Sequence, residues 1–153
     1  MCSSDLEGYI QQTDGNVLDY EFVFAQIETD YKDFDIRRMA YDRWGAARVA
    51  QVLENMGLTV VPFGQGYASM SPPMMELERL VLSGKIRHGN NPVLTWMIDN
   101  VVASMDPAGN IKPDKKKSKE KIDGAVALIM GLDQALRSDD ASMDEILEDD
   151  WGM

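Results

Sequence analysis

The sequence has few of the residues that build disulfides and soft-metal sites. Its 153 residues include a single cysteine, Cys2, and a single histidine, His88. One cysteine excludes an internal disulfide framework and any zinc site based on cysteine, and one histidine excludes a metal cage built from several histidines. Small disulfide-stapled domains and structural zinc domains are therefore excluded as classes for this chain.

Long apolar segments are missing as well. No run reaches 18 consecutive apolar residues, so the sequence predicts no transmembrane helix and no membrane partner. The N-terminus has no basic flank followed by an apolar stretch, which argues against a secretory signal. We therefore expect a cytoplasmic protein, and the length fits one compact domain with one core.

Positive charge is scarce overall but concentrated locally. The chain has 15 Lys and Arg against 26 Asp and Glu, a net charge of −11, which as an average argues against a nucleic-acid partner. Residues 138–153 contain seven acids and no Lys or Arg, so we expect a disordered acidic tail there. Residues 112–121, here called the lysine loop, contain six lysines and only two acids. Their local excess of positive charge suits a polyanion, and the alternative is a merely solvated loop. The six are Lys112, Lys115, Lys116, Lys117, Lys119 and Lys121.

The spacing of apolar residues predicts alternating strands and helices. Strands are expected at 8–13, 36–41 and 58–63, and helices at 19–34, 45–56, 72–83, 92–105 and 119–137. The order strand, helix, strand over residues 36–63 predicts a right-handed crossover between two parallel strands. The expected fold class is therefore α/β.

Two aspartates occupy positions that are typical of catalytic or metal-binding residues. Asp42 directly follows the strand expected at 36–41, at the strand end where α/β sheets place functional groups. The alternative is an N-cap for the helix that starts near Gly45. Asp123 lies beside Gly124 in an apolar helix pattern, and the alternative is an acid in the first helical turn, where the dipole favours it. Two such carboxylates would suit a divalent cation bound through oxygen.

Three stretches resemble one known family. They are YDRWGA (41–46), LERLVLSGKIRHGNNPVLTWMIDNV (77–101) and DPAGNIKPDKKKSKEKIDGAVALIMGL (106–132). In this order and spacing they resemble the C-terminal nuclease domain of the large terminase subunit of tailed bacteriophages, over about residues 7–137. The resemblance implies a partial RNase H-like α/β fold, with a mixed sheet and flanking helices. It also implies an endonuclease that cuts concatemeric viral DNA during genome packaging.

The resemblance implies a catalytic site with two Mg²⁺ or Mn²⁺ ions held by acids. One ion would activate water and the other would stabilise the leaving oxygen. Asp42 matches the second acid of the family, and Asp123 matches the acid of its C-terminal helix. Glu120, one helical turn before Asp123, would be an accessory ligand.

The resemblance also implies a DNA-facing surface and partners. The lysine loop, His88 and Asn100 would line the DNA, whereas Trp96 is expected in the core. The implied partners are double-stranded viral DNA, the small terminase subunit and the portal protein, in the cytoplasm of the host cell.

Two parts of the family pattern have no counterpart in the sequence. The first acid of the family would precede Gly8 by some tens of residues, and the G-x-x-x-x-G-K-[ST] signature of an ATPase motor does not occur. The start MCSSDL is also the translation of a common sequencing-adapter end, GTG TGC TCT TCC GAT CT. We therefore expect residues 1–6 to be an artefact, and the chain to be a C-terminal piece that is nearly inactive on its own.

Two other functions stay open at this point. Another RNase H-like nuclease, of the resolvase or transposase type, would share the two aspartates but not the run 77–101 or the lysine loop. A non-enzymatic acidic interaction protein of phage or host would use both aspartates as helix caps. That second alternative predicts no response to divalent metal.

Overall fold

The computed structural model describes residues 8–11, 13, 15–44 and 46–137. The chain divides into two compact units, residues 1–62 and residues 63–153. The artefact predicted at 1–6 and the acidic tail predicted at 138–153 lie outside the described residues. None of the described helices is long and apolar enough to cross a membrane.

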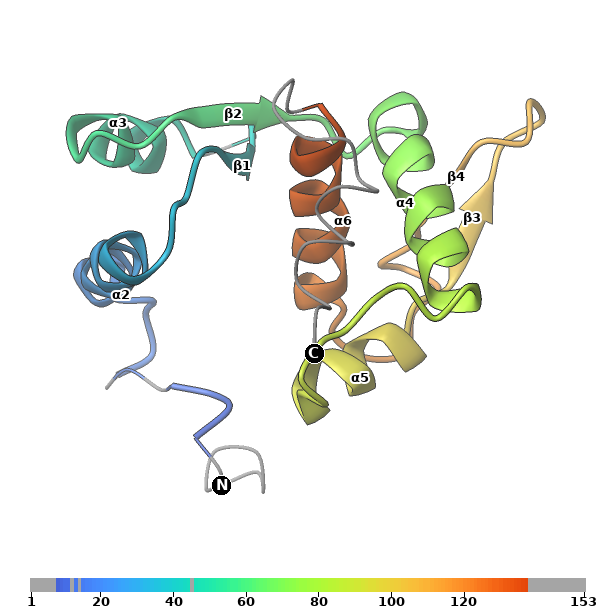
Figure 1. Ribbon diagram of the computed structural model, residues 1–153, viewed down its shortest axis with the longest axis horizontal. Coiled ribbons are helices and arrows are strands. Elements are labelled where there is room, and N and C mark those ends of the chain that lie inside the picture. The colour runs from blue at the N-terminus through green and yellow to red at the C-terminus, as the bar shows by residue number, and fades with distance from the viewer. Residues whose placement is uncertain (1–7, 12, 14, 45, 138–153) are drawn as a thin grey trace, which may run out of the picture. The chain divides into compact units, whose positions relative to one another are not determined.

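The first unit has a helix followed by a strand–helix–strand crossover (Figure 1). Its elements are α2 (Tyr20–Asp33), β1 (Met39–Asp42), α3 (Ala47–Asn55) and β2 (Val60–Phe63). The backbone N–H of Met39 donates to the carbonyl of Thr59 at 2.9 Å. The starts of the paired strands β1 and β2 therefore lie together, as in a parallel pair. This agrees with the predicted crossover.

The strand predicted at 8–13 is wrong. Its described residues form a turn and bends, and the backbone at Gly8 has φ +77°. That angle lies in the left-handed region, far from the extended range a strand requires. Gly8 therefore does not begin a strand at the position where the pattern placed the first strand residue.

Helix α2 forms where it was predicted but buries less than its pattern indicates. Asp19 is the N-cap, and its carboxylate accepts the N–H of Glu21 at 3.0 Å. None of its residues is buried: Val23 and Phe24 are half-buried and Tyr31 is exposed. The apolar spacing correctly indicates a helix, but the described first unit covers that stripe only in part.

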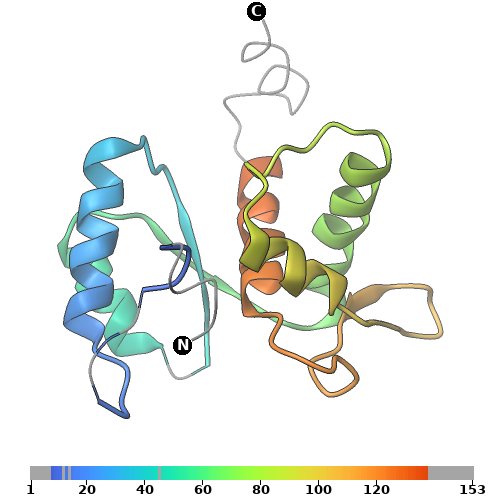
Figure 2. The same cartoon turned by 90° about the horizontal axis from the view of Figure 1, so that it is seen from below.

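The second unit is built on α4 (Tyr67–Leu82) and α6 (Asp123–Leu136), which lie side by side and run in opposite directions (Figures 1 and 2). Between them in the chain come α5 (Pro92–Asp99), β3 (Ala103–Met105) and β4 (Ile111–Pro113). The buried apolar core of the two helices consists mainly of Met70, Leu77, Leu80, Val126 and Ile129, with Ile122 directly before α6. Burying each large apolar side chain contributes about 1.5–3 kcal/mol. Because Ile122 is part of this core, its burial fixes the position at which α6 begins.

Strands β3 and β4 form an antiparallel hairpin in register Ala103↔Pro113. Asp106 holds the turn, because its carboxylate accepts the backbone N–H groups of Ala108 and Asn110, each at 2.9 Å. The side chain of Asn110 donates to the same carboxylate and, as the largest cause, lowers the pKa of Asp106. The two strands beside this turn were not predicted from the sequence.

Three helix boundaries differ from the prediction in the second unit. The helix predicted at 92–105 ends at Asp99, because residues 103–105 pair with β4 instead. The helix predicted to open at the two prolines begins at Tyr67, so Pro72 and Pro73 lie inside it. The helix predicted from residue 119 begins at Asp123, after a buried Ile122.

Candidate functional site

Asp123 is held at the first position of α6 by buried neighbours. Ile122, directly before it, is 2% exposed. The backbone N–H of Gly124, directly after it, donates to the Met97 sulfur at 3.1 Å, and a Cβ at position 124 would lie 2.7 Å from that sulfur. The exposed Asp123 carboxylate therefore sits on a fixed backbone. Its place in the first helical turn is the one that the dipole alternative expects.

The lysine loop meets this carboxylate directly. The Lys115 Nζ lies 2.9 Å from the Asp123 Oδ1, and both side chains are more than half exposed. Exposed pairs of this kind contribute about 0–1 kcal/mol, so the bond matters little for stability. The bond shows where the two residues lie: Lys115, predicted to bind DNA, and Asp123, predicted to bind metal, are in direct contact.

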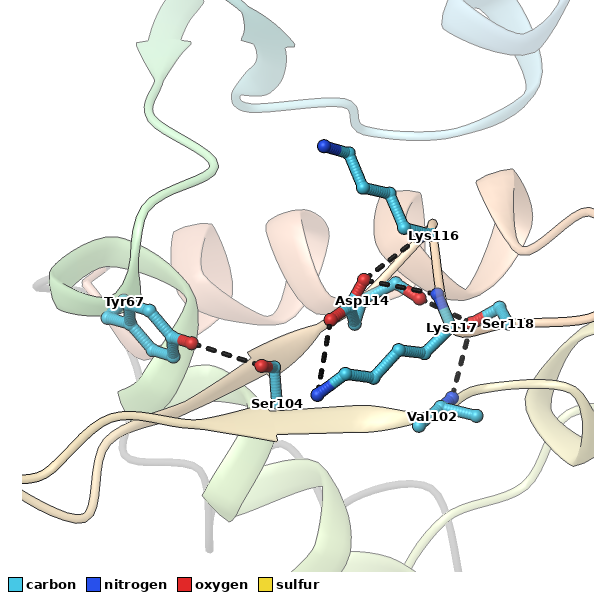
Figure 3. A network of polar contacts seen from close by, with 7 residues as sticks. All are labelled: Tyr67, Val102, Ser104, Asp114, Lys116, Lys117 and Ser118. Carbon is cyan, nitrogen blue, oxygen red and sulfur yellow. Dashed lines mark hydrogen bonds and ion pairs between the residues drawn. The ribbon is translucent and has the colours of Figure 1, made fainter.

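Asp114 fixes the backbone of the lysine loop (Figure 3). Its Oδ1 accepts the N–H groups of Lys116 at 3.0 Å and Lys117 at 3.2 Å, and its Oδ2 lies 3.7 Å from the Lys117 Nζ. Partial desolvation raises the pKa of Asp114. The two N–H groups, the Lys117 charge and the Ser104 hydroxyl outweigh that effect and hold the pKa below its ordinary value. The carboxylate is therefore ionised and shapes the loop.

A second set of bonds ties the loop to the β3–β4 hairpin. The backbone N–H of Asp114 donates to the carbonyl of Val102 at 2.8 Å. The Ser118 hydroxyl accepts the N–H of Val102 at 3.2 Å and donates to the Asp114 carbonyl at 2.8 Å. Tyr67 of α4 donates from its hydroxyl to Ser104 of β3 at 3.1 Å (Figure 3). Helix α4, the hairpin and the loop thus form one connected polar support.

The six lysines fall into two groups. Three are engaged: the Lys112 Nζ lies 4.9 Å from the Tyr67 ring centroid, Lys115 pairs with Asp123, and Lys117 pairs with Asp114. The other three are exposed and form no ion pair within the part of the chain that the structure describes. They are Lys116, Lys119 and Lys121. Lys115 and Lys117 are exposed as well, so the two groups differ in whether the ammonium has a partner. The engaged lysines help to hold the loop, and the other three present their charge to solvent.

Asp42 is the last residue of β1, as predicted. Its Oδ1 accepts the N–H of Trp44 at 3.1 Å, which tightens the turn after the strand. The N-cap of α3 is Ala46, without a side-chain cap bond, so the capping alternative is wrong for Asp42. Trp44 is 77% exposed and lies 5.6 Å from the Arg43 guanidinium, an arrangement that the sequence pattern did not predict.

The remaining predicted residues lie at other places. Glu120 is exposed in a bend before α6, so its expected place one helical turn before Asp123 is wrong. His88 is exposed and lines a mainly apolar cavity of about 740 Å³. Asn100 is the C-cap of α5 and donates to the carbonyl of Trp96 at 2.8 Å. The DNA-facing role of His88 and Asn100 stays a prediction.

Three residues were missed or misplaced. Trp96 is 44% exposed, so its core assignment is wrong. Asp133 is 4% exposed and accepts from the Arg137 guanidinium at 2.7 Å and from the Gln134 amide at 3.0 Å. That bond to Asp133 is the largest cause of the raised pKa of Arg137. Asp114 was passed over too, although an Asp just before a run of turn residues is a known loop-forming signal.

The chain belongs to the family of terminase large subunits, in its endonuclease domain. Residues 5–139 match the family model described as terminase large subunit, endonuclease domain. This match covers most of the chain and confirms the predicted family.

Individual relatives agree with this assignment. The chain is 43% identical over 131 residues to "Terminase, large subunit" of Enterobacteria phage HK97, and 37% identical over 131 residues to "Protein YmfN" of Escherichia coli (strain K12). Each match covers 84% of this chain but only 26% and 29% of the relatives, so the chain spans less than a third of their length.

A solved structure confirms the fold class. The crystal structure of the HK97 bacteriophage large terminase matches with a TM-score of 0.79 and 41% identity. The match covers 86% of this chain and 28% of that one. The fold is thus RNase H-like α/β, with small sheets and flanking helices, as predicted.

Proposed function

We propose that this chain is part of a metal-dependent endonuclease that cuts concatemeric phage DNA during genome packaging. Family membership supports the nuclease chemistry. The observation that carries the assignment of the site is the contact between the lysine loop and Asp123, 2.9 Å from the Lys115 Nζ to the Asp123 Oδ1. This contact places a carboxylate that can bind a metal ion beside a lysine-rich loop that can bind phosphate.

The carboxylates suit Mg²⁺ or Mn²⁺ as ligands. Asp42 and Asp123 offer oxygen donors, which these hard cations prefer. Bound ions would supply an activated water and stabilise the leaving oxygen. We propose that Asp42 and Asp123 are ligands of a metal pair, with Glu120 as an accessory ligand.

The lysine loop binds and positions the DNA backbone in this proposal. Lys116, Lys119 and Lys121 are exposed and carry charge toward solvent, which suits contact with phosphates. Such contacts are independent of sequence and fix the register of the duplex. His88 and Asn100 extend the DNA-facing surface.

We further propose that the 153-residue chain is nearly inactive by itself. The proposed ligands in this chain are Asp42 and Asp123, with Glu120 as an accessory. A two-metal site shares several carboxylates between its ions, so a smaller set holds the second ion poorly. A version extended upstream, with a further acid, would restore cutting.

Plasmid nicking in Mn²⁺ tests this function. The 153-residue chain is expected to nick very slowly and the extended version rapidly. In the extended version, Asp42→Asn and Asp123→Asn should each abolish nicking, with unchanged circular dichroism. The exposed acid Asp33 lies on α2 outside the proposed site, so Asp33→Asn is a matched control that should nick normally. Robust cutting by Asp123→Asn would show that the metal site lies elsewhere.

The proposed partners are double-stranded viral DNA, the small terminase subunit and the portal protein, in the host cytoplasm. Residues 7–137 form the nuclease part in this proposal, and residues 138–153 a solvated acidic tail. The family match favours a terminase over a resolvase or transposase. A non-enzymatic protein would show no dependence on Mn²⁺, so the same nicking assay separates that alternative.

A further inference from the structure

One ion pair joins the two halves of the proposed site. Asp123 is the residue proposed to hold a metal ion, and its Oδ1 already accepts a bond from the Lys115 Nζ at 2.9 Å. A lysine and a divalent cation at the same carboxylate compete for it, because each neutralises the same negative charge. A metal ion at Asp123 would therefore weaken the bond to Lys115.

We propose that Lys115 is a tethered counter-ion, which neutralises Asp123 until a divalent cation arrives and is then released to bind a DNA phosphate. This inference rests on the proposed function. It makes the two binding events help each other, because metal at Asp123 adds one cation to the DNA-binding surface. By the same linkage, DNA that holds the Lys115 ammonium favours metal at Asp123.

The backbone on both sides of this pair is fixed, so the exchange moves only a side chain. Asp114 holds the loop through its bonds to Lys116, Lys117 and Val102. Ile122, 2% exposed, holds the start of α6. The flexible four-carbon stem of lysine lets the ammonium swing from the carboxylate to a phosphate without a change in the loop.

The ion pair between Lys115 and Asp123 is weak enough to be exchanged for a metal ion. The side chains of Lys115 and Asp123 are 52% and 65% exposed, so the bond is weak and a divalent cation can displace it. The neighbouring lysines do not fit the role. Lys117 is taken by Asp114, and Lys116 points its exposed side chain to solvent.

A metal titration tests the competition without any cleavage. Mn²⁺ is added to the 153-residue chain, and its binding is followed by paramagnetic broadening of the Asp123 backbone amide in NMR spectra. Lys115→Ala should bind Mn²⁺ about two- to fivefold more tightly than wild type, since an exposed ion pair no longer competes. Lys116→Ala removes the same charge one residue away and should change the affinity much less. Lys115→Arg keeps the pair and should behave as wild type.

A second measurement follows the released lysine. The salt dependence of binding to a short duplex is compared in EDTA and in Ca²⁺. For wild type the slope of log K against log salt should steepen by about 0.9 in Ca²⁺, the value of one added phosphate contact. For Lys115→Ala the two slopes should agree.

The outcomes distinguish a failure of the counter-ion role of Lys115 from a failure of the proposed metal site. If Asp123→Asn removes Mn²⁺ binding but Lys115→Ala and Lys116→Ala act alike, the counter-ion role is overturned and the metal site stands. If Mn²⁺ never broadens the Asp123 amide in any variant, the metal site itself is wrong, and the counter-ion role falls with it. A tighter Lys115→Ala together with the lost Ca²⁺ effect supports the proposal.

Discussion

The division of the lysine loop into engaged and exposed lysines makes a quantitative prediction. Each lysine that contacts a phosphate contributes about 0.9 to the salt slope of duplex binding. Replacing the exposed Lys116, Lys119 and Lys121 by Ala should therefore flatten the slope by about 2.7. Between 50 and 200 mM salt, that change corresponds to about 40-fold in the salt sensitivity of the affinity.

A matched triple variant lies in the same loop. Lys112, Lys115 and Lys117 contact Tyr67, Asp123 and Asp114, so in EDTA fewer of them are available to phosphates. Replacing these three by Ala removes the same charge but should flatten the slope by less than about half as much. Fluorescence anisotropy with a labelled duplex measures both slopes, and circular dichroism checks folding. Equal slopes for the two variants would refute the division.

Three further predictions concern stability and pH. Gly131→Ala should raise stability by about 0.5–1 kcal/mol, seen as a higher Tm, because a Cβ there meets nothing within 4 Å and alanine favours the helix; a lower Tm would contradict this. Ile129→Ala should cost about 2–5 kcal/mol in urea unfolding, since Ile129 is 1% exposed, and a loss below 1 kcal/mol would show a looser core. Because the folded pKa of Asp114 is lowered, its support of the loop is full above the ordinary value of 3.8 and is lost only as the pH falls through the lower folded value. The Lys116 amide shift should therefore titrate below pH 3.8, and a midpoint above it would contradict the assignment.

The sequence predicted helices well where a cap or a terminating glycine accompanied the apolar spacing. Asp19 begins α2 as expected, and Gly57 (φ +91°) follows α3 as the expected stop. Spacing alone failed at residues 101–105, because Val101 and Met105 continue the helical period although their segment pairs across a hairpin. Such pairing depends on residues 111–113, and a local pattern carries no information about it.

The site was predictable in its residue types but not in its support. The positions of Asp42 at a strand end and of Asp123 at a helix start were predicted because both are local features, and their role as metal ligands stays a prediction. The bonds of Asp114 to Lys116 and Lys117 are local, and the Asp was a signal that the prediction passed over. The bond from Tyr67 to Ser104 joins residues that are 37 positions apart, which only the folded chain brings together. The same holds for Lys115, whose partner is eight residues away across a bend.

The sulfur of Met97 sits where even a methyl group on Gly124 would not fit, 2.7 Å from that Cβ position. Oxidation to the sulfoxide would add a polar oxygen to this contact and turn an apolar thioether into a bulkier, chiral group. Helix α5 would then be pushed from the first turn of α6, and the Asp123 carboxylate would move with it. Oxidation of this one methionine would thus disturb the backbone that carries the proposed metal ligand, and methionine sulfoxide reductase would reverse the change.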